Sequence, residues 1–392
     1  MRNLKADVFA VGAQDWDRRV FDELIPLNEG TSYNAYLIKG SEKTALIDSV
    51  DPEKTDILVN NILRCGVEKI DYVVSNHCEQ DHSGSIPDIL MLYPEAKVVT
   101  NEKNKGFLSA HLHIEEDKFI VVGEDDTVSL GNKTLQFALI PWVHWPETMG
   151  TYLVEDKILF PCDMFGSHLA TSDLFAEPDS TLYSCAKGYF AEIMMPFRTA
   201  IKKNLDKLSK FDIEMIAPSH GPVHKDPKFI MDAYGQWVGD KVENKVLMPF
   251  ISMHGSTRKM VEYLTECLLD RDIAVNPFNL IGGNLDVLAC DLVDSATVIL
   301  AGPQVLAGAH PAVANAAFLA NALRPKTKFA TVIGSYGWGG KMVDNLVGMM
   351  PNLKVELFEP IMVKGLPREE DYALLEKLAD SIVEKHKSIG IC

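Results

Sequence analysis

The feature that most constrains the fold is a strict alternation of apolar runs and helical patterns that begins near Asn244. Five apolar runs of strand length are separated by longer segments with helical periodicity. Strands that are apolar along nearly their whole length lie in parallel sheets that helices cover on both faces. The sequence therefore predicts a doubly wound α/β sheet in the second half of the chain.

The expected strands of this second half are Val246–Ile251, Ile273–Phe278, Thr297–Ala301, Lys328–Gly334 and Lys354–Phe358. The expected helices are Thr257–Asp270, Leu285–Leu292, Pro311–Leu323, Lys341–Met350 and Arg368–Lys387. Five strands in about 148 residues suit a flavodoxin-like domain.

The first half has a different pattern, in which many short strand-like runs are separated by turns rich in Gly, Asn, Asp and Lys. The expected strands are Ala35–Ile38, Thr44–Asp48, Tyr72–Ser75, Lys97–Thr100, Phe119–Val122, Thr134–Leu139, Thr151–Val154 and Lys157–Phe160. The expected helices are Pro52–Arg64, His82–Tyr93 and Ala191–Lys210. The change of pattern places the boundary between Gly235 and Asn244, which gives domains over residues 1–243 and 244–392.

Charge and composition exclude several classes of partner. The formal net charge of −17 argues against nucleic acid and against an anionic membrane, because either would need a basic face. No run approaches the ~20 apolar residues that span a bilayer, and the N-terminus lacks the apolar stretch of a signal peptide, so we expect a cytoplasmic protein. The seven cysteines include no Cys-x-x-Cys pair, which excludes a disulfide scaffold, a zinc ribbon and a rubredoxin-type iron site.

A cluster of metal-type side chains follows the expected strand at Tyr72–Ser75. Within six residues the chain offers two imidazoles and two carboxylates, from His77, Glu79, Asp81 and His82. These groups suit zinc and first-row metals such as iron, whereas soft metals would favour thiolates. Loops at strand ends are where α/β proteins commonly place ligands and catalysis. The cluster therefore predicts a metal site.

Three single residues repeat the pattern of strand, short turn and metal-type side chain. They are His144, Asp163 and His220. Any one of them alone is more often an ordinary polar residue at a turn, but the cluster makes all three candidates for completing a metal site. His168 is a further candidate to lie beside the ligands.

Three loops at strand ends in the second half suggest a phosphate-containing ligand. Hydroxyls and backbone N–H groups at a helix N-terminus form an anion site, and the first loop offers Ser252, Met253, His254, Gly255, Ser256 and Thr257. The second loop contains Pro303, Gln304, Val305, Leu306 and Ala307. The third contains Ser335, Tyr336, Gly337, Trp338 and Gly339. In flavodoxin-like folds such loops flank the point where FMN binds.

The ordered set of seven metal-type residues resembles the ligand series of the flavodiiron proteins, also called A-type flavoproteins: His77, Glu79, Asp81, His82, His144, Asp163 and His220. The resemblance implies a metallo-β-lactamase-like αββα sandwich followed by a flavodoxin-like FMN domain. It gives the first iron His77, Glu79 and His144, the second iron Asp81, His82 and His220, and makes Asp163 the bridge. Some members do not use the equivalent of His82.

The resemblance implies reduction of dioxygen to water, of nitric oxide to nitrous oxide, or of both, at two non-haem iron ions refilled by FMN. It also implies an external electron donor, which is rubredoxin, a flavin reductase or a reduced deazaflavin in the family, and a head-to-tail homodimer or tetramer. This sequence departs from the family in the middle flavin loop, where Gly302-Pro303-Gln304 replaces the usual Ser-Pro-Thr, and at His254, where an aromatic residue is common.

Two other functions fit parts of the sequence. The first alternative is a zinc hydrolase of the metallo-β-lactamase fold fused to a flavodoxin-like module. Such hydrolases typically have a histidine where this chain has Glu79, and the harder carboxylate oxygen favours iron over zinc. The second alternative is a flavodoxin-type electron carrier with a degenerate first domain that binds no metal.

Overall fold

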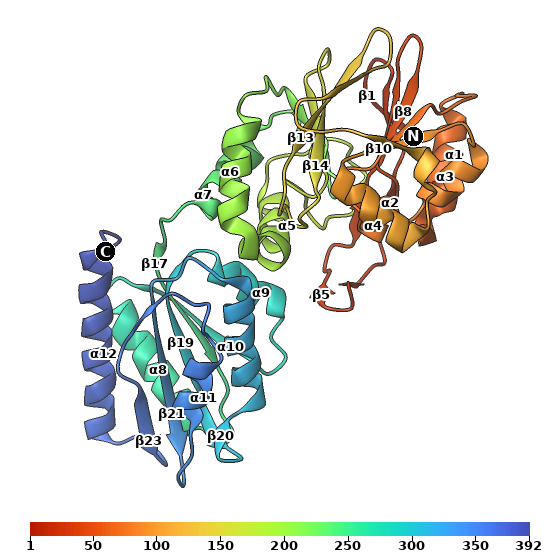
Figure 1. The fold of residues 1–392 in the computed structure, drawn as a ribbon. Helices are drawn as coiled ribbons and strands as arrows, with labels where there is room; N and C mark the ends of the chain where they lie inside the picture. The colour runs from red at the N-terminus through yellow and green to blue at the C-terminus, as the bar shows by residue number, and fades with distance from the viewer. The chain divides into compact units, whose positions relative to one another are not determined.

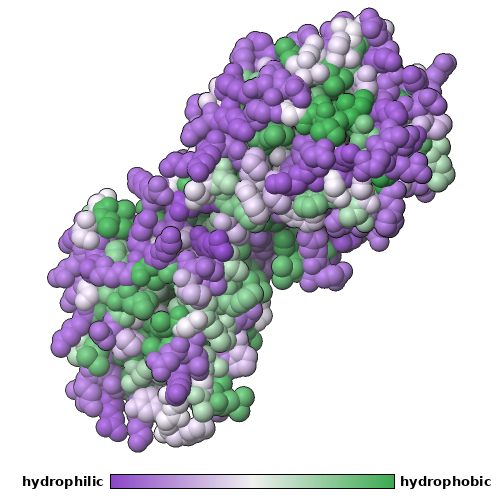
Figure 2. All heavy atoms as spheres, in the orientation of Figure 1, coloured by the Kyte–Doolittle hydropathy of each residue, from purple (hydrophilic) through white to green (hydrophobic).

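The computed structural model describes all 392 residues, which form two compact units, Met1–Val238 and Gly239–Cys392. The division lies five residues before the boundary that we predict at 243/244. In Figure 2 hydrophilic side chains cover much of the visible face of each unit. None of the helices combines the length and the apolar character needed to cross a membrane.

The first unit is built on two sheets that pack against each other. The larger has the order β1-β2-β7-β8-β9-β10-β11 and the smaller the order β12-β13-β14-β15-β16. The strands of the larger sheet are β1 (Arg2–Lys5), β2 (Val8–Ala10), β7 (Tyr36–Lys39), β8 (Thr44–Ile47), β9 (Tyr72–Val74), β10 (Lys97–Thr100) and β11 (Phe119–Val121). Those of the smaller are β12 (Thr127–Ser129), β13 (Thr134–Leu139), β14 (Met149–Leu153), β15 (Ile158–Phe160) and β16 (Met215–Ile216). Two short pairs, β3 (Ala13–Asp15) with β6 (Thr31–Tyr33) and β4 (Val20–Phe21) with β5 (Ile25–Pro26), flank them.

Successive side chains of a strand point to opposite faces of the sheet, so one strand can contribute to two hydrophobic cores. On β7, Tyr36 and Ile38 face the smaller sheet, where they join Phe137 of β13 in one buried cluster. Leu37 points to the other face and packs with Leu46 and with helix residues. Both faces of the larger sheet are therefore apolar, and the layer order is helix, sheet, sheet, helix.

Helices cover the outer face of each sheet in the first unit (Figure 1). The larger sheet is covered by η1 (Pro52–Lys54), α1 (Thr55–Arg64), α2 (Gln80–Ser83), α3 (Ile86–Leu92) and α4 (Glu102–Leu112), with η2 (Glu116–Lys118) at its end. On the other side lie α5 (Ser180–Tyr189), η3 (Phe190–Met194), η4 (Met195–Phe197), α6 (Arg198–Leu208) and α7 (Lys228–Val238). Asn204 of α6 donates a hydrogen bond to the carbonyl oxygen of Pro141, which ties this layer to the end of β13.

The second unit is a parallel sheet with the order β18-β17-β19-β21-β22, and β23 also pairs with β21. This is the flavodoxin-like order in which the first strand lies between the second and the third. The strands are β17 (Glu243–Phe250), β18 (Ala274–Asn279), β19 (Ser295–Val305), β20 (Gly308–Ala309), β21 (Phe329–Tyr336), β22 (Glu356–Leu357) and β23 (Ile361–Lys364). The helices are α8 (Ser256–Leu269), α9 (Leu285–Leu292), α10 (Pro311–Leu323), α11 (Met342–Gly348) and α12 (Glu369–Ser388). Helices lie on both sides of the sheet, as Figure 1 shows.

Four local predictions were wrong. The helix expected at His82–Tyr93 is two helices, α2 and α3, that are separated at Gly84. The helix expected at Ala191–Lys210 begins as π and 3-10 turns, and its regular part, α6, starts only after Pro196, because proline has no N–H to donate. The strand expected at Lys354–Phe358 is reduced to two residues, and the sheet is completed by β23. The strand expected to end at Ala301 continues to Val305 and turns into β20.

Truncation of Leu46 tests how far the first unit depends on its sheet–helix core. Leu46 is 0 % exposed, so Leu46→Ala is expected to lower the free energy of unfolding by about 2–5 kcal/mol through lost burial and a cavity. The matched control is Leu63→Ala on α1, whose side chain is 59 % exposed and whose loss should cost less than about 0.5 kcal/mol. Urea denaturation followed by circular dichroism measures both. Equal midpoints for the two variants would contradict the prediction.

Candidate functional site

The seven predicted metal-type residues all lie at strand ends of the first unit, where neighbouring strands bring them together. The loop and short helix after β9 provide His77, Glu79, Asp81 and His82. His144 follows β13, Asp163 follows β15, and His220 follows β16. Two groups in which the ligand atoms lie within 4.8 Å of one another hold all seven residues: His77, Glu79, His144 and Asp163; and Asp81, His82 and His220. A third such group, His82, Cys162 and Asp163, overlaps both.

The carboxylate of Asp163 is divided between the two groups. Its Oδ2 lies 3.5 Å from Nε2 of His77 and 3.6 Å from Nε2 of His144. Its Oδ1 lies 2.9 Å from Nε2 of His82 and 3.5 Å from Nε2 of His220. Asp163 is 1 % exposed, so one buried carboxylate faces both groups.

Each group also has a carboxylate of its own. Oε2 of Glu79 lies 2.9 Å from Nε2 of His144 and 3.2 Å from Nε2 of His77. Oδ2 of Asp81 lies 3.1 Å from Nε2 of His220 and 3.2 Å from Nε2 of His82. Each position therefore presents two imidazoles and one carboxylate, and shares Asp163.

Several buried polar atoms at this site have no hydrogen-bond partner in the protein. They include both oxygens of Asp81, Oδ2 of Asp163 and both ring nitrogens of His82. Unpaired buried carboxylates are costly unless a cation satisfies them. Glu79, Asp81 and Asp163 together offset three of the four charges that two ferrous ions would bring. The residues present therefore fit two divalent metal ions with nitrogen and oxygen ligands.

Contacts behind the ligands fix their orientation. Nδ1 of His77 lies 2.6 Å from Oε1 of Glu147, and Nδ1 of His220 lies 2.6 Å from the carbonyl oxygen of Ser32. The hydroxyl of Ser219 donates to Oδ1 of Asp163 at 2.8 Å. Glu147 is a functional candidate that the sequence analysis missed. The only sequence feature that points to Glu147 is weak: it is an acidic residue three positions after His144 in the same loop.

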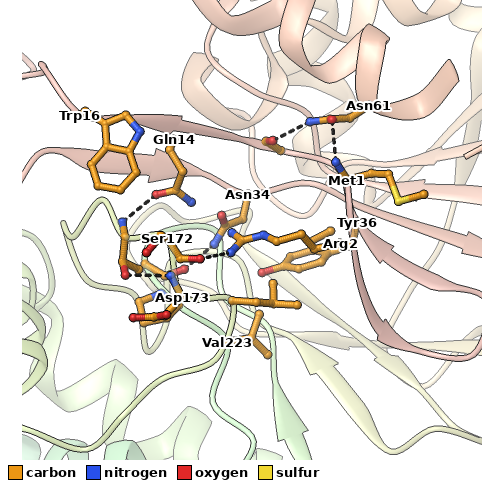
Figure 3. A pocket seen from close by; sticks show the side chains of 16 residues that line it. Met1, Arg2, Gln14, Trp16, Asn34, Tyr36, Asn61, Ser172, Asp173 and Val223 are labelled. Carbon is orange, nitrogen blue, oxygen red and sulfur yellow. Dashed lines mark hydrogen bonds between the residues drawn. The ribbon is translucent and has the colours of Figure 1, made fainter. Parts of the chain in front are cut away.

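The loop that carries His220 is held from its other side as well. Nδ2 of Asn34 donates to the carbonyl oxygens of Pro218 and Gly221, and the Tyr36 hydroxyl donates to Pro218. Figure 3 shows these side chains in a cavity of about 260 Å³ that Gly221 helps to line. Gly221 has φ of +79°, and a Cβ there would lie 2.1 Å from Oγ of Ser167, so only glycine fits this turn.

His168 and Tyr189 lie beside the second group. The ring centroids of His168 and His220 are 5.1 Å apart, and those of His168 and Tyr189 are 4.8 Å apart. Burial and the neighbouring His220 hold the pKa of His168 well below its ordinary value, so this ring is neutral. Burial and the Asp163 carboxylate raise the pKa of Tyr189 well above its ordinary value, so the phenol keeps its proton.

The titration of His82 should make the stability of the metal-free protein depend on pH in a way that the stability of the metal-loaded protein does not. Burial alone would lower the pKa of His82, but Asp163 and Asp81 outweigh it and raise the pKa from 6.5 to about 9. Protonated His82 therefore stabilises the metal-free fold fully below about pH 6.5, and this stabilisation is lost as the pH rises to 9. The loss expected from His82 is about 3 kcal/mol, and His77, whose burial is likewise outweighed by neighbouring carboxylates that raise its pKa well above the ordinary value, adds a loss in the same direction.

Urea denaturation at a series of pH values measures this loss. Metal-loaded protein is the control, because a bound ion replaces the proton on His82 and should leave stability nearly flat in this window. A metal-free protein whose stability does not change between pH 6.5 and 9 would contradict the prediction.

The three predicted flavin loops lie at the carboxyl ends of adjacent strands in the second unit. Ser252, Met253, His254 and Gly255 join β17 to α8, and Ser256 and Thr257 form the first turn of that helix. Oγ1 of Thr257 lies 3.3 Å from Oγ of Ser335, which connects the first loop with the third. Gln304 donates from Nε2 to the carbonyl oxygen of Trp338, which connects the second loop with the third.

The middle loop is a hairpin, in which Gln304 pairs with Ala309 and Val305 with Gly308. Leu306 and Ala307 form its tip with positive φ, and Leu306 is 86 % exposed. At the first loop Gly255 has φ of +91°, with nothing within 4 Å of the place where a Cβ would stand. This open turn before the N-terminus of α8 fits a phosphate group.

Comparison with known proteins identifies the family. A family model described as "ODP family beta lactamase" matches residues 31–221. A nitric oxide reductase from Moorella thermoacetica is 35% identical over 390 residues, which cover 96% of this chain and 98% of that protein. A rubredoxin-oxygen oxidoreductase from Megalodesulfovibrio gigas is 30% identical over 387 residues, which cover 96% of each chain.

Solved structures agree. The rubredoxin oxygen:oxidoreductase from Desulfovibrio gigas superposes with a TM-score of 0.94 at 29% identity, over 98% of each chain. A flavodiiron protein from Giardia intestinalis gives 0.91 at 29% identity, again over 98% of each chain. The chain belongs to the flavodiiron family of oxidoreductases. The predicted family and the predicted fold class, a metallo-β-lactamase-like sandwich followed by a flavodoxin-like sheet, are confirmed.

Proposed function

We propose that this chain reduces dioxygen to water, nitric oxide to nitrous oxide, or both, with electrons that pass from an external donor through FMN to two non-haem iron ions. The observation that carries the proposal is the buried Asp163 carboxylate, whose two oxygens face two separate groups of ligand atoms. The names of two relatives, a nitric oxide reductase and a rubredoxin-oxygen oxidoreductase, support the same chemistry.

Under this proposal His77, Glu79 and His144 hold one iron, and Asp81, His82 and His220 hold the other. Two ferrous ions and reduced FMN together supply four electrons, which is the number that dioxygen needs to form two waters, while coupling two nitric oxide molecules needs two. Glu79 in place of a third imidazole supports iron over the zinc of related hydrolases, because its harder oxygen is the better ligand for iron.

The protein's own side chains then control water and protons around the metals. Phe21 is 6 % exposed and packs against His168 and His220, with ring centroids 4.8 and 5.8 Å away, so it excludes water from this side. The phenol of Tyr189, held close to Asp163, keeps its proton and can donate a hydrogen bond near the metals. The ring of His168 is neutral and brings no further positive charge to the site.

FMN would bind at the three loops of the second unit. The hydroxyls of Ser252, Ser256 and Thr257 and the N–H groups of the first turn of α8 would hold its phosphate. Tyr336 and Trp338 would pack near the isoalloxazine ring, and Trp338 is 67 % exposed as such a role requires. The reduced flavin would be regenerated by rubredoxin, a flavin reductase or a reduced deazaflavin, and the active form would be a head-to-tail homodimer or a tetramer.

The test of the proposal combines metal analysis with anaerobic stopped-flow. The purified protein should contain two irons and one FMN per chain, and the fully reduced protein should be reoxidised by dioxygen, nitric oxide or both within seconds. Separate experiments with dioxygen and with nitric oxide establish which of the two substrates the protein prefers. Zinc without iron or flavin would support a hydrolase instead, and flavin without metal would support a simple electron carrier. Reoxidation by both gases that takes longer than minutes would refute the proposal.

A further inference from the structure

Three buried ligand histidines differ in what their outer ring nitrogen contacts. Nδ1 of His77 faces a carboxylate, Oε1 of Glu147, at 2.6 Å. Nδ1 of His220 faces a neutral backbone carbonyl, that of Ser32, at the same distance. Nδ1 of His82 has no hydrogen-bond partner in the protein. Among these three rings, only that of His77 has a negatively charged partner behind it, so the two metal positions differ in the charge that supports them.

Glu147 is itself held in place by the surrounding chain. Its side chain is fully buried, and Oε1 also accepts a hydrogen bond from the backbone N–H of Cys78 at 3.2 Å. Asn101 donates from Nδ2 to the carbonyl oxygen of Glu147 at 2.6 Å. The carboxylate thus reaches the outer ring nitrogen of His77 from a fixed backbone, and Glu147 belongs to none of the groups of side chains that could hold a metal ion.

We propose that Glu147 is a positioning residue that makes the position of His77, Glu79 and His144 the tighter of the two metal positions, so that metal fills it first. A carboxylate that accepts from Nδ1 fixes the tautomer with Nε2 towards the metal, restrains the ring and makes the imidazole more basic. A backbone carbonyl orients the ring of His220 without adding a negative charge. This inference rests on the proposed function, because it assumes that the seven residues bind two metal ions.

The experiment is an anaerobic titration of chelator-treated, full-length protein with Co²⁺, followed by the visible absorption of bound cobalt and by equilibrium dialysis. The unchanged protein should bind two ions in two steps that differ in affinity by at least ~10-fold. Glu147→Gln should weaken the first step by ~10–100-fold, which is the range for lost partners of metal-bound histidines, and should leave the second step unchanged. Combined with His220→Ala, which removes the second position, Glu147→Gln should weaken the single remaining step by the same factor.

A matched control is Asp48→Asn, the same loss of a buried carboxylate in the same unit. Asp48 accepts hydrogen bonds from Asn76 and from no histidine, so the first step should lose much less affinity than in Glu147→Gln. Glu147→Asp keeps the charge on a shorter side chain and should lose less affinity than Glu147→Gln. It also provides the comparison if Glu147→Gln does not fold.

Two results would overturn the inference and leave the proposed function intact. One is binding of two cobalt ions by the unchanged protein with a single affinity. The other is a Glu147→Gln effect that is absent, equal on both steps or matched by Asp48→Asn. If the unchanged protein binds fewer than two ions, the proposed function fails, and the inference fails with it.

Discussion

Asp163→Asn is expected to yield a protein that retains FMN but binds neither iron stably. The Asp163 side chain is buried, and its two oxygens face imidazole nitrogens of both metal positions at 2.9 to 3.6 Å. The amide of asparagine has one oxygen instead of two, so it cannot serve as a shared ligand of both metal positions. It also carries no charge, so the site loses one of its three negative charges. Metal affinity should fall by more than ~100-fold, beyond the range for partners outside the ligand set.

Iron and flavin per chain, measured together after gel filtration, test this expectation. The flavin should stay, because residues 239–392 form a compact unit of their own. The control is Ser219→Ala, which removes the hydrogen bond to Oδ1 of Asp163 but leaves the carboxylate in place, and should lower metal affinity much less. An Asp163→Asn protein that retains two irons per chain would contradict the assignment of Asp163 as the shared ligand.

The sequence predicts most of the fold because burial leaves a periodic trace. Leu37 and its neighbours Tyr36 and Ile38 contribute to two cores, and the unbroken apolar run that such a strand needs is visible without coordinates. The break at Gly84 is not visible in this way. A Cβ there would lie 2.4 Å from the carbonyl oxygen of Gln80 and 2.7 Å from the Pro52 ring, and Pro52 is remote in sequence. That packing constraint has no local signal.

The same distinction applies to the site. The seven metal-type residues could be found because imidazoles and carboxylates recur at strand ends, and parallel strand ends meet at one edge of a sheet. Glu147 could not, because an acid in a loop is normally solvated. What marks it is full burial against His77, and burial of a loop residue depends on tertiary packing.

The hairpin at Gln304–Ala309 also escaped prediction, since Leu306 and Ala307 are not residues that favour positive φ.

Thr257→Asp is expected to have the opposite effect to Asp163→Asn, with loss of FMN and retention of both irons. Thr257 is 1 % exposed, lies in the first turn of α8 and approaches Ser335 to 3.3 Å between hydroxyl oxygens. In our proposal this is where the flavin phosphate binds. A carboxylate there would occupy the N–H groups at the helix N-terminus and repel the phosphate. Two like charges about 4 Å apart near a protein surface cost ~4 kcal/mol, which corresponds to about a thousandfold loss of affinity.

The quenching of FMN fluorescence on binding to flavin-free protein measures this loss, and Thr257→Ser is the control because it keeps the hydroxyl and adds no charge. Thr257→Asp protein with normal FMN affinity would refute the proposed phosphate site.

Together the two variants separate the steps of the proposed electron path. With a competent donor, Asp163→Asn should still accept electrons into its flavin but should not consume either gas. Thr257→Asp should retain two irons that the donor cannot reduce, and it should react with gas only after its irons are reduced chemically. If Thr257→Asp turned over normally with the donor, electrons would reach the irons without FMN, and the role proposed for the second unit would be wrong.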